Sequence, residues 1–250
     1  MRVLLRAGFV AAAVVIGIGT AHAAEIKVMA VNAVKEAYVE LISGFEKTSG
    51  HKVTTIWGGS ENIAKRVHDG EVVDIVFSTD SNIDKLISAG RLVAGSRADF
   101  AKSSVGVAVR SGLPKPDISS GEAVKSAVLS AKSVAYSSGA SGFYLAELFK
   151  KMGIADQIKD KVKQPASGAQ IGELVARGEA DMGFQQVSEL LNVKGIDYLG
   201  PLPAGIQYIT VFSAGLHAAA PAPDAAKALV KFLTAPEAGP MIRKMGMEPG

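Results

Sequence analysis

The sequence predicts an α/β fold made of two doubly wound parallel-sheet lobes joined by two crossing strands. Residues 26–90 contain three strand-then-helix units, the pattern typical of a parallel sheet. A second series of such units runs through residues 133–199. Two further long apolar stretches, at 104–110 and 209–216, are predicted to connect the two series. Two lobes joined in this way leave a cleft between them, where the carboxyl ends of the strands bind ligands.

In the first series, short apolar runs alternate with segments in which apolar residues recur at helical spacing. Strands are predicted at residues 26–30, 52–57 and 74–78. Helices are predicted to follow them, beginning near Val34, Ser60 and Ser81, with the two serines as N-caps. The third strand is a continuous apolar run, as expected for a parallel strand that is buried on both faces.

The second series begins with the segment 133–152. Val134–Tyr136 suits a short buried strand, and apolar residues from Leu145 to Met152 recur at helical spacing. Between them lies the small-residue loop 137–142, which offers hydroxyls and the unpaired N–H groups at the positive end of a helix. Such a loop favours anion binding, although serine and glycine are also common as ordinary caps.

The remaining elements follow from the same patterns. Helices are predicted at 120–130 and 168–177, with two more beginning at Asp224, as an N-cap, and at Pro236. Two short strands are predicted at 181–185 and 196–199.

Residues 1–23 have the features of a secretory signal peptide. Arg2 and Arg6 precede an apolar run from Phe9 to Ile18, and Ala21-His22-Ala23 is a small-residue cleavage signal. We therefore expect export to the periplasm, with cleavage near Ala23. Without the two arginines the chain has 25 basic and 24 acidic residues, so its charge gives no reason to expect nucleic acid or a membrane as a partner.

Several kinds of chemistry are not expected from this sequence. It has no cysteine, which excludes disulfides and thiol catalysis. The histidines lack the paired spacing of zinc sites, and there is no phosphate-binding Walker loop and no GxSxG nucleophile motif. These observations predict a protein with no metal and no cofactor that is not an enzyme.

Five stretches, taken in this order, are typical of one protein family: KVMAVNAV, WGGSENIAKRV followed by DIVFSTD, SGFYLAELFKKMGI, LVARGEADMGFQQ and ALVKFLTAPEAGPMIRKMGM. With them the chain resembles, over residues 26–246, the periplasmic molybdate-binding family, which are type II solute-binding proteins of ABC importers. The resemblance implies a type II periplasmic-binding-protein fold. It implies lobe I at residues 24–106 plus 212–250, and lobe II at residues 107–211. It also implies a monomer that delivers a small anion to a membrane ABC permease.

Members of that family hold a tetrahedral oxyanion with hydroxyl and backbone N–H groups. Transferred to this chain, the ligand contacts fall on Ala33, Ser60, Ser141, Gly168 and Gln186. Weaker candidates near them are Asn32, Val34, Ser137 and Gln185.

The family pattern has serine at position 33 and tyrosine at 186, a small apolar residue at 141 and a larger aliphatic one at 168, so only Ser60 is retained. Loss of a hydroxyl donor to an anion costs about 1.5–3 kcal/mol. Two classes of ligand are therefore compatible with the sequence. One is molybdate or tungstate, and the other is a different small anion, such as a carboxylate. A periplasmic enzyme acting on a small anion and a ligand-sensing module remain alternative functions.

Overall fold

The computed structural model describes residues 23–250 of the chain. The predicted signal peptide therefore lies outside the described residues, apart from Ala23. None of the helices in the described part is both long and apolar enough to cross a membrane.

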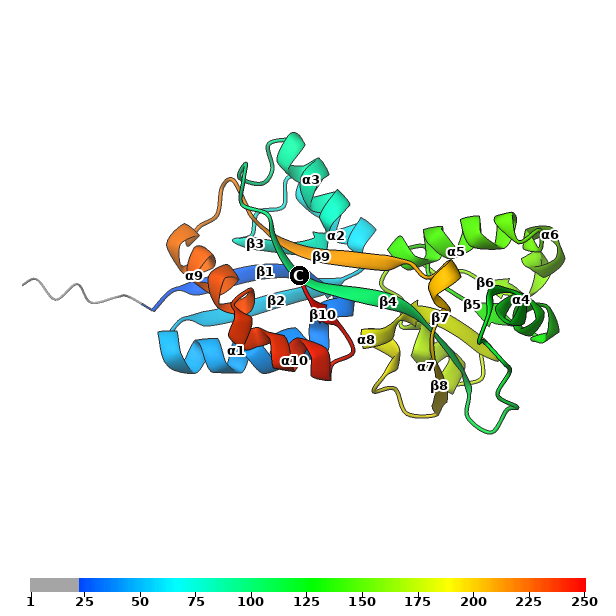
Figure 1. The fold of residues 1–250 in the computed structure, drawn as a ribbon. Helices are drawn as coiled ribbons and strands as arrows, with labels where there is room; N and C mark the ends of the chain where they lie inside the picture. The colour runs from blue at the N-terminus through cyan, green and yellow to red at the C-terminus, as the bar shows by residue number, and fades with distance from the viewer. Residues whose placement is uncertain (1–22) are drawn as a thin grey trace, which may run out of the picture.

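Lobe I is built on three parallel strands, β2 (Lys52–Gly58), β1 (Glu25–Val31) and β3 (Ile75–Thr79), in that order across the sheet. Its helices are α1 (Lys35–Ser49), α2 (Ser60–His68), α3 (Asp80–Ser88), α9 (Pro223–Leu233) and α10 (Gly239–Lys244). The short 3₁₀ turns η1 (Asn32–Val34) and η4 (Pro236–Ala238) connect these elements, and α3 lies on the opposite side of the strands from α1 and α10 (Figure 1).

Lobe II repeats this arrangement with shorter strands, β7 (Met182–Gln186), β5 (Val134–Ala135) and β6 (Val162–Lys163), which are also parallel. Its helices are α4 (Gly121–Ser130), α5 (Ala140–Lys151), α6 (Ala155–Ile158), α7 (Ile171–Ala176) and α8 (Val187–Leu190). The 3₁₀ turns η2 (Lys159–Lys161) and η3 (Ala204–Ile206) and the strand β8 (Ile196–Pro201) complete it.

Two antiparallel strands, β4 (Ala98–Arg110) and β9 (Ile209–Leu216), run side by side between the lobes (Figure 1). Residues 98–104 of β4 pair with β9, and residues 105–110 pair with β7 and β8 of lobe II. β4 begins six residues before the predicted strand because its first half also pairs with β10 (Glu248–Pro249). The predicted fold class, two α/β lobes with two crossing strands, is confirmed.

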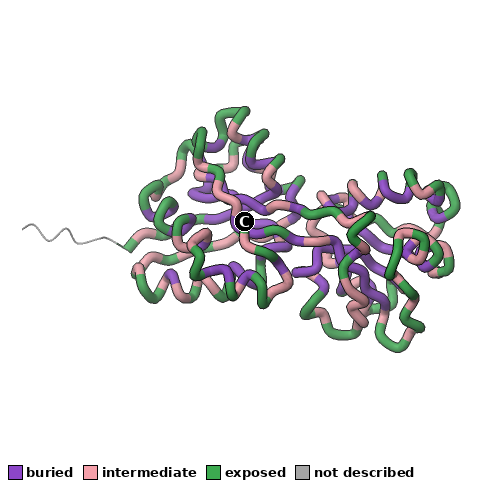
Figure 2. Tube along the Cα trace, viewed as in Figure 1, coloured by how far each residue is buried: buried purple, intermediate pink, exposed green. Residues whose placement is uncertain are grey.

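Each lobe has its own hydrophobic core, visible as buried segments within each half of the molecule (Figure 2). In lobe I the ring of Phe77 packs edge-on against Tyr38 and Phe100, with both centroid distances 5.6 Å. In lobe II the rings of Phe149 and Phe184 lie 5.8 Å apart. Separate cores support the proposed lobe boundaries, because two cores linked by few strands can move as two rigid bodies.

The helix predicted over 168–177 begins only at Ile171, because Gly168 has a left-handed φ of +93°. Three predicted helix caps also differ from the structure. Thr79, and not Ser81, caps α3 by accepting a hydrogen bond from the Asn82 N–H at 3.3 Å. Ser60 is the first residue of α2 and makes no capping bond, so its hydroxyl is not used to start the helix. The N-cap of α9 is Ala222 and not Asp224. The helix begins at Pro223, whose fixed φ suits the first helical position.

Candidate functional site

A small cavity of about 40 Å³ lies where the two lobes meet, which is room for roughly a few water molecules. Both lobes and the crossing strand β9 supply its lining. From lobe I these residues are Val31, Asn32, Ala33, Gly58, Gly59, Ser60 and Phe212. From lobe II they are Ser137, Gly139, Ala140, Ser141, Ser167, Gly168, Ala169, Gln185, Gln186 and Glu189.

The cavity lies at the carboxyl ends of the parallel strands, as the sequence predicts. The segments that follow β1, β2, β5 and β7 all contribute to its wall. Crevices outside these strand ends are the usual ligand sites of open α/β sheets. The site therefore follows from the order of strands and helices along the chain.

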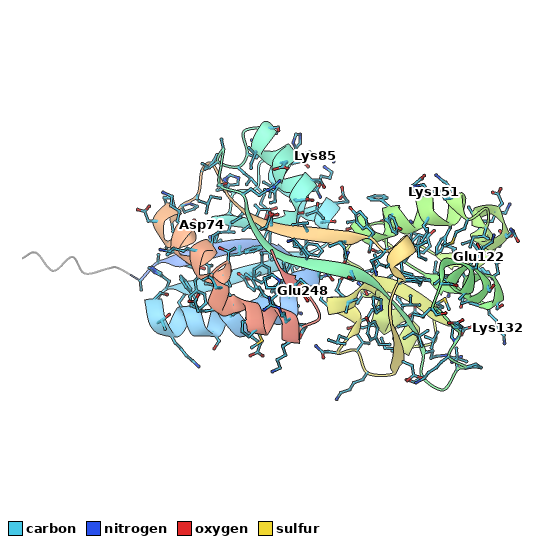
Figure 3. The ribbon with its side chains drawn as sticks, viewed as in Figure 1. Asp74, Lys85, Glu122, Lys132, Lys151 and Glu248 are labelled. Atoms are coloured by element: carbon cyan, nitrogen blue, oxygen red, sulfur yellow. The ribbon has the colours of Figure 1, made fainter. Side chains whose placement is uncertain are left out.

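Two helix N-termini meet at the cavity from opposite lobes, α2 and α5, which face one another in Figure 1. The first helical hydrogen bond of α2 runs from the Ile63 N–H to the Gly59 carbonyl. The first one of α5 runs from the Phe143 N–H to the Gly139 carbonyl. The N–H groups at the start of each helix are thus free for a ligand and carry partial positive charge. No cationic side chain is among the described residues that line the cavity. Lys85 and Lys151 lie on exposed helix surfaces (Figure 3).

Eight of the nine residues predicted for the site are brought together around this cavity: Asn32, Ala33, Ser60, Ser137, Ser141, Gly168, Gln185 and Gln186. Val34 is the exception, because its side chain is buried in the core of lobe I. Their role as ligand contacts stays a prediction.

The amide of Gln186 is directed toward the crossing strands. With its oxygen accepting from the Thr210 hydroxyl at 2.8 Å, its nitrogen lies 3.2 Å from the Ser103 carbonyl and 3.3 Å from that of Ser104. Thr210 belongs to β9, and the two serines belong to β4. Gln186 thus links lobe II to both strands of the hinge while it lines the cavity.

Direct contacts hold the lobes together beside the cavity. The Asn32 side chain donates to the Gly168 carbonyl at 3.0 Å. Gly168 has φ +93°, and a Cβ atom on it would lie 2.6 Å from the backbone nitrogen of Gly59. This approach of two main chains is possible only for glycine, and it describes lobes that are closed on one another.

Glu189, which the sequence analysis did not identify, is the one residue with an ionisable side chain among the described residues that line the cavity. Its carboxyl oxygen Oε1 accepts a hydrogen bond from Gln185 Nε2 at 2.9 Å. Burial raises the pKa of Glu189 to about 8, and the Gln185 hydrogen bond opposes part of that rise. A single glutamate on a four-residue helix has no sequence motif, so only its surroundings make it conspicuous.

A larger groove of about 660 Å³ adjoins the cavity and shares Asn32 and Glu189 with it. Charged residues of both signs line this groove, namely Lys35, Glu36, Glu173, Arg177, Glu189 and Lys194. Lys35 lies over the ring of Trp57, with its ammonium 5.8 Å from the ring centroid. Asn32 and Glu189 therefore separate an inner cavity lined by neutral polar groups from an outer groove lined by charged ones.

Comparison with known proteins shows two kinds of relative. The family described as bacterial extracellular solute-binding protein matches residues 26–248. An aconitate isomerase of Pseudomonas sp. is 38% identical over 217 residues, covering 84% of this chain and 82% of the relative. The molybdate-binding protein ModA of Azotobacter vinelandii is 29% identical over 236 residues, with 90% of each chain covered.

The structure of the periplasmic molybdate-binding protein of Azotobacter vinelandii superposes with a TM-score of 0.76 at 20% identity, covering 90% of this chain and 99% of that one. The resemblance to molybdate-binding proteins is thus confirmed.

One prediction is overturned by these findings. We expected a protein that is not an enzyme, and a relative with 38% identity over most of the chain is named as one. The expectation failed because the absence of zinc, nucleophile and phosphate motifs excludes only the reactions that need them. Proton transfer needs one well-placed carboxyl group, which short motifs do not reveal.

Proposed function

Because the chain belongs to the bacterial extracellular solute-binding protein family, we propose that its inter-lobe cavity captures a small polycarboxylate of the aconitate class and isomerises it. The observation that carries this proposal is the similarity to an aconitate isomerase over 84% of the chain. The same family membership supports secretion to the periplasm, which we propose together with removal of residues 1–23.

The cavity suits one carboxylate of such a ligand. Ser60 and Ser141 offer hydroxyls from opposite lobes, and the starts of α2 and α5 offer backbone N–H groups. Hydrogen bonds to a charged group are each worth about 1.5–3 kcal/mol, so several neutral donors can hold an anion without a lysine or arginine. The adjoining groove has room for the further carboxylates. Lys35 and Lys194 line it as cations, whereas Arg177 is paired with Glu173 and Glu179.

Aconitate can be isomerised by moving one proton along its three-carbon backbone. Removal of a proton from the methylene carbon and its return at the far alkene carbon shifts the double bond and exchanges the cis and trans forms. Negative charge in the intermediate spreads onto carboxylate oxygens. Preorganised N–H donors of the kind found at this cavity stabilise such charge best when it develops in the transition state.

Capture of a molybdate-like oxyanion for an ABC permease is the second candidate function. The similarity to molybdate-binding proteins over 90% of the chain favours it, as does an inner cavity only large enough for a compact anion. Delivery to a permease requires the lobes to open and close about β4 and β9, a hinge motion that the two separate cores permit.

One experiment separates these functions. The purified mature protein is incubated with cis-aconitate in D₂O, and proton NMR follows the alkene and methylene signals. We expect conversion to an equilibrium mixture with the trans isomer, accompanied by deuterium at the methylene carbon. A thermal shift with molybdate and tungstate, and none with either aconitate isomer, together with unchanged NMR spectra, would support oxyanion transport and refute the isomerase.

A further inference from the structure

Resting on the proposed function, we propose that Glu189 is the catalytic acid–base group that moves the proton between the two ends of the allylic unit. Nothing in the sequence motifs or in the family resemblance points to this residue. Three features of the structure do: its place between two spaces, the support of its carboxyl group, and the lack of a cationic partner among residues 23–250.

The first feature is the position of Glu189 at the junction between the cavity and the groove. A cavity of about 40 Å³ admits one carboxylate, so the rest of a tricarboxylate must extend outward. Asn32 and Glu189 line both spaces, so a ligand that occupies the cavity and the groove together would lie against them. In that arrangement the carbon backbone of the ligand lies beside the Glu189 side chain.

The second feature is the way Gln185 positions the carboxyl group. The Gln185 oxygen accepts from the Gly172 N–H at 3.2 Å, and its nitrogen donates to the Ala169 carbonyl at 3.1 Å. These two main-chain partners fix the orientation of the amide. The second hydrogen of the same nitrogen is donated to Glu189 Oε1, at 2.9 Å. Gln185 is thus a positioning residue that engages one oxygen of Glu189 and leaves the other for the substrate.

The third feature is that no salt bridge of Glu189 is found among the described residues. The charged groups that line the groove beside it are Lys35 and Glu36 from α1, Glu173 from α7, and Arg177 and Lys194 from lobe II loops. Glu173 is itself paired with Arg177, at 3.6 Å. Partial burial raises the pKa of Glu189 above its ordinary value, which lessens the negative charge that an approaching anion meets.

The proton transfer balances as follows. The ionised carboxylate of Glu189 takes a proton from the methylene carbon, and the electron pair of that C–H bond forms a new C=C bond to the central carbon. The π electrons of the old double bond move to the far alkene carbon, which then takes the proton back from Glu189. No oxidant, reductant or leaving group is needed. A base whose pKa lies near the working pH is the most effective for such a step.

The test compares Glu189→Gln with the wild type in the NMR assay and measures trans-aconitate binding by calorimetry. Glu189→Gln is expected to lower both isomerisation and deuterium exchange by roughly 10²–10⁴-fold, while the Kd changes less than about tenfold. Glu147→Gln on α5 is the matched control, because Glu147 is exposed and does not line the cavity, and it should behave as the wild type. Glu189→Asp keeps a carboxyl group and is expected to retain part of the activity.

The outcomes distinguish the two proposals. If the wild type isomerises aconitate and Glu189→Gln stays within threefold of it, the acid–base role is overturned and the proposed function stands. Loss of trans-aconitate binding by Glu189→Gln would also overturn it, in favour of a binding role. If the wild type neither isomerises nor exchanges protons, the proposed function fails and the role of Glu189 fails with it.

Discussion

The hydroxyl of Ser188 in lobe II donates a hydrogen bond of 2.7 Å to the main-chain carbonyl of Ala33 in lobe I. Both residues are buried, and Ser188 immediately precedes Glu189 on α8. This contact fastens α8 to the turn that follows β1. It therefore couples closure of the lobes to the placement of the Glu189 carboxyl group.

Ser188→Ala should weaken ligand binding by destabilising the closed arrangement. A buried hydrogen bond contributes about 0.5–1.5 kcal/mol, so we expect the Kd for trans-aconitate to rise roughly threefold to tenfold, measured by calorimetry. Ser133→Ala is the control, since the Ser133 hydroxyl accepts from the Asp181 N–H at 3.0 Å within lobe II. It should lower the melting temperature without changing the Kd. An unchanged Kd for Ser188→Ala would show that the contact does not contribute to closure.

Gly168→Ala should impair binding through a clash between the lobes. Its Cβ atom would lie 2.6 Å from the Gly59 nitrogen, at a backbone φ of +93° that disfavours any side chain. Gly50→Ala separates the two effects, because Gly50 has φ +74° with nothing within 4 Å of a Cβ atom. We expect both variants to melt at lower temperature than the wild type, while only Gly168→Ala loses ligand-induced stabilisation. Equal ligand shifts in both variants would contradict an inter-lobe contact at Gly168 in the bound state.

Ser60→Ala should remove one hydroxyl donor from the predicted anion cradle. Loss of a hydrogen bond to a charged ligand corresponds to roughly tenfold weaker binding or more. The melting temperature of the ligand-free protein should change little, since the Ser60 side chain does not cap α2. Calorimetry and thermal unfolding measure the two quantities separately. If the variant binds the ligand with wild-type affinity, the Ser60 hydroxyl does not contact the ligand.

The raised pKa of Glu189 predicts a pH-dependent stability in the ligand-free protein. The pKa is about 8 in the folded state against an ordinary value of 4.5, so between these pH values the unfolded chain loses a proton that the folded chain keeps. The free energy of unfolding should therefore fall as the pH rises from 4.5 to 8, and Glu189→Gln should abolish this contribution.

Thermal unfolding across pH checks this prediction. Glu189→Gln should melt close to the wild type at pH 4.5 and several degrees above it at pH 8.5, because the variant has no carboxyl group whose ionisation favours the unfolded chain. Glu147→Gln should show the opposite and smaller trend, because Lys150 holds the pKa of Glu147 below its ordinary value. Parallel curves for Glu189→Gln and the wild type would mean that Glu189 ionises normally in the folded protein.

The order of strands and helices, and the strand ends at which a ligand can bind, follow from local patterns in the sequence. The apolar runs at 74–78 and 209–216 became β3 and β9 because continuous buried strands have one signature wherever they occur. Since turns after parallel strands lie at one edge of the sheet, Asn32 and Ser60 are expected together in lobe I and Ser141 at the corresponding edge of lobe II. The packing of the lobes brings the two edges together at the cavity.

Which polar groups are available at the cavity, and which are engaged elsewhere, depends on contacts that form only in the folded chain. Gln186 bonds to Thr210 and Ser188 bonds to Ala33, and both partners are distant in sequence. Gln185 bonds to Glu189 four residues later, across the junction of β7 and α8. The raised pKa of Glu189 comes from its burial beside a cavity that residues of both lobes line. Desolvation and hydrogen bonding arise only when these segments come together, so no local pattern in the chain encodes them.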